Sequence, residues 1–212
     1  MRFTKLGHAC VRLEKDGGVL VIDPGAFSGE AALDGADAVL VTHEHFDHVV
    51  PDSLRAALAA RPGLRVWAPG SVTGEFAEYG DRVKTVGHGD TFTAAGFGVH
   101  VYGSEHAVIH PDIPTVANVG FLVDGEVFHP GDSYTVPEDP AGTLLLPGSG
   151  PWHCTADMID YARAVAPRRG FVIHEALLSE TGLSVLEMFL GLAAGPGGAA
   201  FTRLEPGTSV DL

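Results

Sequence analysis

The chain has 212 residues, 45% hydrophobic and 19% charged, a balance typical of a globular domain and unlike that of a disordered segment. Its 13 Lys and Arg against 27 Asp and Glu give a net charge of −14, which disfavours binding to nucleic acid phosphates. We find no apolar run of the roughly 18 residues that a membrane helix needs, and the N-terminus lacks a signal-peptide pattern. We therefore expect a cytoplasmic protein without membrane contact, in which Cys10 and Cys154 are free thiols.

The first half of the chain predicts strands joined by tight turns. β-Branched and alternating residues between glycine signals predict strands at residues 2–6, 9–15, 17–23 and 64–69. Residues 37–42 are a nearly continuous apolar run, as in a strand buried on both faces. Helices are predicted at residues 52–60, behind Pro51, and from Ser71, as the capping residue, to about Gly80.

The second half repeats this order of strands followed by strand–helix units. Strands are predicted at residues 81–86, 90–95, 97–103, 143–147, 170–174 and 199–204, and 118–132 reads as a hairpin with Asp124-Gly125 at its tip. Thr155 is expected to cap a helix over 156–166, and Ser184 with Glu187 predicts a capping box for a helix ending near Gly195. Two such halves predict a single α/β domain over residues 1–212, built as a four-layer αββα sandwich.

The segment His43-x-His45-x-Asp47-His48 contains four potential metal ligands in six residues, directly after the apolar strand. On a helix, positions i and i+2 face apart, whereas in an extended turn they point the same way. His43 and His45 can therefore hold one metal, and Asp47 with His48 can hold a second beside it. Imidazole and carboxylate ligands suit zinc, iron, nickel or manganese.

This motif resembles the hallmark of the metallo-β-lactamase superfamily, His-x-His-x-Asp-His. The opening LGHACVRLE and the later HPGDSY resemble the lactonase-like and metal-dependent hydrolase branch of that superfamily. The resemblance implies the αββα fold with its site at one edge between the sheets. It also implies a full ligand set: His43, His45 and His106 on the first metal, Asp47, His48 and His174 on the second, and Asp132 bridging them.

Several positions have more than one interpretation. His110 fits the expected order of ligands as well as His106 does, and the choice between them stays open. His8 either makes a structural hydrogen bond or points into the site. Asp23, in a turn after a strand, is expected to support the His loop from behind. His153, after the glycine-rich segment 148–150, is expected to lie near the substrate.

The predicted chemistry is hydrolysis. Two divalent ions, zinc first and manganese, iron or nickel as alternatives, lower the pKa of a shared water so that hydroxide attacks the substrate. Asp47 is expected to orient that hydroxide and carry a proton, and His153 to stabilise the oxyanion. The expected partner is a small-molecule ester, lactone or phosphodiester. The alternatives are a non-catalytic metal-dependent binding or sensing protein and a di-iron redox protein; the oligomeric state is not predicted.

Overall fold

The computed structural model describes residues 1–195 and 198–212, whose strands form two seven-stranded sheets. The first sheet contains, in spatial order, β14 (Ser209–Asp211), β1 (Arg2–Gly7), β2 (Cys10–Lys15), β3 (Gly18–Ile22), β4 (Ala38–Leu40), β5 (Arg65–Ala68) and β6 (Val83–Thr85). The second contains β13 (Ala200–Thr202), β12 (Arg169–Ile173), β11 (Thr143–Pro147), β10 (Val127–His129), β9 (Gly120–Val123), β8 (Phe97–Tyr102) and β7 (Thr91–Ala94).

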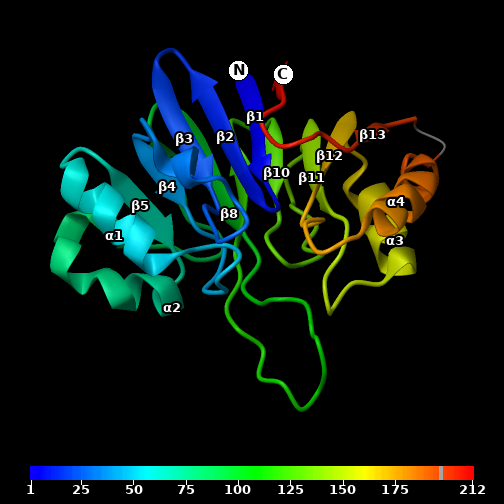
Figure 1. The fold of residues 1–212 in the computed structure, drawn as a ribbon, viewed down its shortest axis with the longest axis horizontal. Helices are drawn as coiled ribbons and strands as arrows, with labels where there is room; N and C mark the ends of the chain where they lie inside the picture. The colour runs from blue at the N-terminus through cyan, green and yellow to red at the C-terminus, as the bar shows by residue number, and fades with distance from the viewer. Residues whose placement is uncertain (196–197) are drawn as a thin grey trace.

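Helices cover the outer face of each sheet and complete four layers (Figure 1). On the first sheet lie η1 (Glu30–Leu33), α1 (Pro51–Ala60), α2 (Gly70–Thr73) and η2 (Gly74–Arg82), and on the second lie α3 (Thr155–Val165) and α4 (Glu180–Ala193). The predicted αββα sandwich is confirmed. Among the described residues, no helix combines the length and apolarity needed to cross a bilayer.

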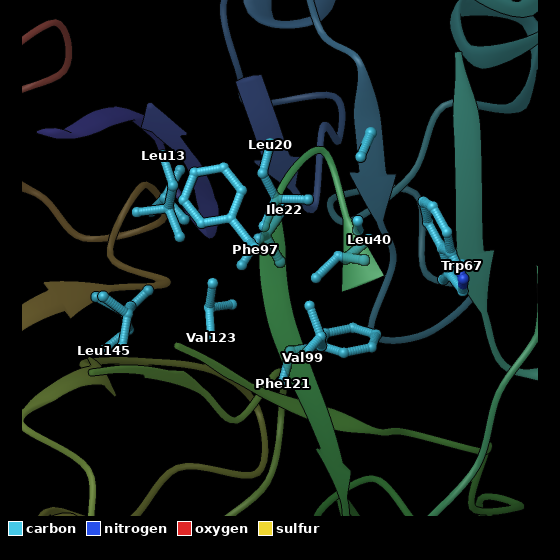
Figure 2. Close-up of a cluster of buried hydrophobic side chains, with 14 of the residues drawn as sticks. Leu13, Leu20, Ile22, Leu40, Trp67, Phe97, Val99, Phe121, Val123 and Leu145 are labelled. Atoms are coloured by element: carbon cyan, nitrogen blue, oxygen red, sulfur yellow. The ribbon is translucent and has the colours of Figure 1, made fainter. Parts of the chain in front are cut away.

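The main core lies between the sheets, where apolar side chains of both inner faces meet (Figure 2). Leu13, Ile22 and Leu40 of the first sheet pack in one cluster with Phe121 and Val123 of the second, all fully buried. Burying one such side chain contributes about 1.5–3 kcal/mol. The central strands β4, β9 and β11 are buried along their whole length, which accounts for their continuous apolar sequences.

The strand directions bring distant loops to one edge of the sandwich. In the first sheet β3 to β6 are parallel, and in the second β10 to β13 are parallel. Parallel strands end at the same edge, so the loops after β4, β10 and β12 gather there. The long segment between β8 and β9 projects from the same edge in Figure 1.

The structure corrects several boundaries predicted from the sequence. The helix expected to start at Ser184 begins at Glu180, because Ser179 is the N-cap and accepts a hydrogen bond from the Gly182 amide. Ser184 lies inside the helix and donates to the Glu180 carbonyl. Thr155 is the first residue of α3, not its cap. The helix expected from Ser71 is interrupted and continues as η2, and β14 was not predicted.

Candidate metal centre

The predicted ligands converge at the edge where the loops gather. His43, His45, Asp47 and His48 lie in the turn between β4 and α1, which is closed by hydrogen bonds from the amides of His48 and Val49 to the His45 carbonyl. The others follow strands of the second sheet: His106 after β8, Asp132 after β10 and His174 directly after β12. Both sheets therefore contribute to one site.

The first group of ligands contains His43, His45, His106 and Asp132, with one ligand atom of each within 4.8 Å of all the others. His43 Nε2 lies 3.0 Å from His45 Nδ1, and His106 Nε2 lies 3.3 Å from Asp132 Oδ2. Ligands bound at about 2.0–2.2 Å around one zinc ion stand at comparable separations. His45 presents Nδ1 to this group, whereas His43 and His106 present Nε2.

The second group contains His8, Asp47, His48 and His174, with one ligand atom of each within 4.8 Å of all the others. Two of its members, His48 and His174, also lie beside Asp132. His174 Nε2 lies 2.9 Å from Asp132 Oδ2 and 3.4 Å from Asp47 Oδ2. His48 Nε2 lies 3.1 Å from the other carboxylate oxygen, Asp132 Oδ1. The Asp132 carboxylate thus stands between the two groups, in the position of a bridging ligand.

The hydrogen bonds of the imidazoles fit metal binding. The Nδ1 atoms of His48, His106 and His174 lie 2.7, 2.6 and 2.8 Å from oxygens of Asp23, Ala107 and Ser149, and each can donate its proton there. Among the described residues, the Nε2 atoms of these three histidines and Asp132 Oδ1 are buried without a hydrogen-bond partner. Fixing the proton on Nδ1 leaves an Nε2 lone pair aimed at the centre, which is how proteins orient histidine ligands.

The carboxylates and imidazoles of the site each favour the charged form of the other. Burial alone raises the pKa of Asp132, but the imidazoles of His48, His106 and His174 outweigh it and hold that pKa well below its usual value. Burial lowers the pKa of His174, yet the carboxylates of Asp132 and Asp47 overcome it and raise the pKa to about 9. The carboxylates are therefore ionised, and a cation entering the site displaces protons from imidazoles.

A second layer of residues holds the ligands in place. Asp23 accepts hydrogen bonds from the Thr42 amide and hydroxyl and lies 2.7 Å from His48 Nδ1, so its predicted support of the His loop is confirmed. Gly25 packs against the Asp47 backbone so closely that a Cβ there would overlap it. Of the two interpretations of His8, the ring points into the site: it is buried, and its Nε2 lies 3.1 Å from Asp47 Oδ2.

The sequence analysis did not identify two contacts to Asp132. The Trp152 indole donates to Asp132 Oδ2 at 3.1 Å, and Asn118 Oδ1 accepts from the Asp132 amide at 3.0 Å. Nothing in the local sequence marks Trp152 or Asn118 as a partner of Asp132. Both contacts join segments far apart in the chain.

The structure places the remaining histidines outside the two groups of candidate ligands. His110, the alternative to His106, is exposed and accepts a hydrogen bond from the Asp112 amide. His129 is buried with Nε2 at 2.8 Å from the Ala9 carbonyl, and His100 pairs with Asp139 away from the site. His153 lines a cavity next to the metal centre, and its Nε2 is buried without a partner among the described residues.

The centre opens into a cavity of about 260 Å³. Its floor is formed by ligands, including His45, His106 and Asp132, and its walls are the apolar side chains of Phe27, Phe46, Ile109, Pro151, Trp152 and Leu177. A small molecule entering this cavity would meet the ligands at one end and apolar groups around it.

Comparison with known proteins defines the family. Residues 2–174 match the family model described as the beta-lactamase superfamily domain, and the chain belongs to this superfamily. A Mycobacterium tuberculosis relative, protein Rv0786c, is 35% identical over 185 residues, covering 84% of this chain and 86% of its own. A metal-dependent hydrolase of Aeropyrum pernix is 26% identical over 189 residues, covering 77% of this chain and 76% of its own.

The solved structures agree on the fold. The metallo hydrolase Igni18 of Ignicoccus hospitalis superposes with a TM-score of 0.74 at 21% identity, covering 99% of this chain and 97% of its own. The metallo-beta-lactamase fold protein YhfI of Bacillus subtilis gives 0.73 at 14% identity, covering 99% and 98%. At these identities the likeness concerns the fold alone.

Proposed function

We propose that this protein is a metal-dependent hydrolase that holds two divalent ions, with zinc as the first candidate, and acts on a small ester, lactone or phosphodiester. The observation that carries the proposal is the Asp132 carboxylate, whose oxygens lie within 3.3 Å of His106 in the first group and of His48 and His174 in the second. The relatives described as metal-dependent hydrolases support the reaction class.

His43, His45 and His106 would hold one ion, Asp47, His48 and His174 the other, and Asp132 both. Two such ions supply Lewis acidity and lower the pKa of a water molecule toward neutrality. In the reaction, the water oxygen adds to the carbonyl carbon or phosphorus, the bond to the leaving oxygen breaks, and the leaving group takes up a proton.

We assign to Asp47 the transfer of that proton to the leaving group. Burial raises the pKa of Asp47, but the neighbouring imidazoles of His174 and His8 outweigh it and hold the pKa well below its usual range. The carboxylate is therefore ionised and accepts a hydrogen bond from the attacking water. Its Oδ2 faces His8 and His174, which leaves Oδ1 for the water and the leaving group. His153 contacts the substrate from the adjacent cavity.

The test combines metal analysis with a substrate panel. Elemental analysis of the purified protein is expected to give about two metal ions per chain. The zinc-loaded protein is then assayed on esters, lactones and phosphodiesters. Asp47→Asn is expected to lower kcat/KM by about 10²–10⁴-fold, the usual contribution of a positioned acid–base group. Its circular dichroism spectrum is expected to match that of the unsubstituted protein.

Asp112→Asn is the matched control, because the Asp112 side chain is 91% exposed and is not part of either ligand group. Full activity in Asp47→Asn contradicts the role of Asp47, and a chain without bound metal contradicts the proposal as a whole. Stoichiometric metal with no turnover across the panel favours a metal-dependent binding protein instead.

A further inference from the structure

A second cavity adjoins the metal pocket. It has a volume of about 530 Å³ and lies between the loop after β11 and the first turns of α4. Leu177 lines both cavities. In the loop between them, Gly150 and His153 face the second cavity, while Pro151 and Trp152 face the metal pocket. One side chain and one short loop therefore form the wall between the two spaces.

Large apolar side chains form much of the walls of both cavities. The second cavity is lined by Leu178, Val185, Leu186 and Phe189, among others, and the rim of the metal pocket carries Phe46 and Leu177. Phe46 is 64% exposed and Leu177 is 60% exposed. Large apolar side chains left in water beside a binding site mark a surface that an apolar ligand covers.

No Lys or Arg side chain lines either cavity, among the residues that the structure describes. Lys5, the basic residue tied to the segment after His174, is fully buried in an ion pair with Glu175. Phosphate and carboxylate groups of substrates are commonly held by Arg or Lys. An anionic group beyond the reacting centre would have no such partner here, and the chain's net charge of −14 would repel it.

Polar side chains also line the second cavity, namely those of Ser149, His153, Thr155, Ser179 and Thr181. His153 Nε2 is buried without a hydrogen-bond partner among the described residues. A buried polar nitrogen left unpaired costs free energy, and a substrate oxygen or amide beside the junction would satisfy it.

We infer, on the basis of the proposed function, that the substrate is a neutral carboxylic ester or lactone with an apolar tail. Its carbonyl lies at the metal centre and its tail passes Leu177 into the cavity beside α4. The length of the tail, rather than a charge, then determines which substrates are preferred.

The experiment measures kcat/KM of the zinc-loaded protein on γ-lactones of increasing alkyl length, from butyrolactone to dodecalactone. Each added methylene that enters the cavity is expected to raise kcat/KM roughly threefold to fourfold until the cavity is filled. Bis(p-nitrophenyl) phosphate is expected to be hydrolysed more slowly than the long lactones. A chain-length profile that stays flat, or a preference for the phosphodiester, overturns the inference.

Val185→Trp and Met188→Trp form a matched pair on α4. Val185 lines the second cavity, whereas Met188 lies three residues further along, 74% exposed and outside it. Val185→Trp is expected to fill the cavity and flatten the chain-length profile. Met188→Trp is expected to keep the profile of the unsubstituted protein. Identical profiles in all three proteins overturn the inference.

A binding measurement separates this inference from the proposed function. Isothermal titration calorimetry with 2-decanone, a neutral ketone that cannot be hydrolysed, is expected to show binding that Val185→Trp abolishes and Met188→Trp preserves. If no substrate is turned over but this binding pattern is found, the hydrolase proposal fails and the apolar cavity is supported. If lactones are hydrolysed but 2-decanone does not bind, the inference fails and the hydrolase proposal stands.

Discussion

At the scale of single residues, His8 connects two parts of the site without belonging to the predicted ligand set. Its Nδ1 accepts a hydrogen bond from the Ala176 amide at 3.3 Å, so the proton of the neutral ring is on Nε2. That Nε2–H points at Asp47 Oδ2, 3.1 Å away, and the ring lies 4.0 Å from the His174 ring, centre to centre. His8 thus orients the Asp47 carboxylate and, carrying this proton, does not coordinate through Nε2.

His8→Phe keeps an aromatic ring but removes the hydrogen bond to Asp47. We expect affinity for the second ion to fall by about 10–100-fold, the usual effect of losing a group that orients a ligand. Titration with Co²⁺, followed by visible absorption and by competition with a chelator, measures this. His110→Phe is the control, since His110 is exposed and outside both ligand groups. Equal affinities in the two variants would show that His8 does not position Asp47.

The two cysteines differ sharply in environment. Burial and the nearby charge of Asp23 raise the pKa of the Cys10 thiol well above its usual value, whereas Cys154 is exposed. Because the thiolate is the reactive form, Ellman's reagent at pH 8 is expected to modify one thiol rapidly in the native protein and two after unfolding in guanidinium. Cys154→Ser is expected to abolish the rapid reaction and to leave hydrolysis unchanged. Two rapidly reacting thiols in the native protein would contradict this assignment.

At the scale of elements, a buried ion pair ties the two sheets together near the site. Lys5 of β1 donates to both carboxylate oxygens of Glu175, at 2.8 and 2.9 Å, and to the Val172 carbonyl at 2.8 Å. Burial lowers the pKa of Lys5 against the attraction of Glu175. Glu175 directly follows His174, so the pair fixes the end of β12 against the first sheet.

Lys5→Met is expected to lower the free energy of unfolding by about 3–5 kcal/mol, because it leaves the Glu175 charge buried and unpaired. The double variant Lys5→Met with Glu175→Leu is expected to recover most of that loss. Urea denaturation in the presence of a chelator measures both without the contribution of bound metal. Lys15→Met is the control: its ion pair with Asp124 is partly exposed and contributes about 0–1 kcal/mol. A double variant as unstable as Lys5→Met would contradict this account.

The sequence predicted most elements because their signals are local. Continuous apolar runs identified β4 and β11, and the Asp124-Gly125 turn identified the hairpin of β9 and β10. The start of α4 was misplaced because Ser179 and Ser184 both suit an N-cap, and only the hydrogen bond to the Gly182 amide separates them. β14 was missed because it is three residues long and pairs with Arg2–Thr4, at the far end of the chain.

The site likewise has parts with a local sequence signal and parts that depend on contacts between distant segments. The four candidate ligands between His43 and His48 could be recognised because they lie together in the sequence. The cavity walls could not, because Phe27, Phe46 and Leu177 are ordinary apolar residues until the fold brings them together. The role of Trp152 at Asp132 depends in the same way on the meeting of two loops.

At the scale of the whole molecule, the metal centre lies across the boundary between the two halves. His43, His45, Asp47 and His48 follow a strand of the first sheet, whereas His106, Asp132 and His174 follow strands of the second. An ion bound by these residues would therefore crosslink the sheets at their open edge. A ligand that binds only the folded state adds its binding free energy to the stability of the whole chain.

Removal of metal is therefore expected to destabilise the entire fold. At a metal concentration about 1,000 times Kd, binding contributes about 4 kcal/mol, and for a chain of this size each kcal/mol shifts Tm by roughly 2–4 °C. Differential scanning calorimetry with and without EDTA is expected to show Tm falling by roughly 8–16 °C, and rising again when Zn²⁺ is restored. Asp132→Asn, which weakens both groups at their shared ligand, is expected to melt at nearly the same temperature with or without EDTA. An unchanged Tm after elemental analysis has verified metal removal would mean that the ions do not join the two sheets.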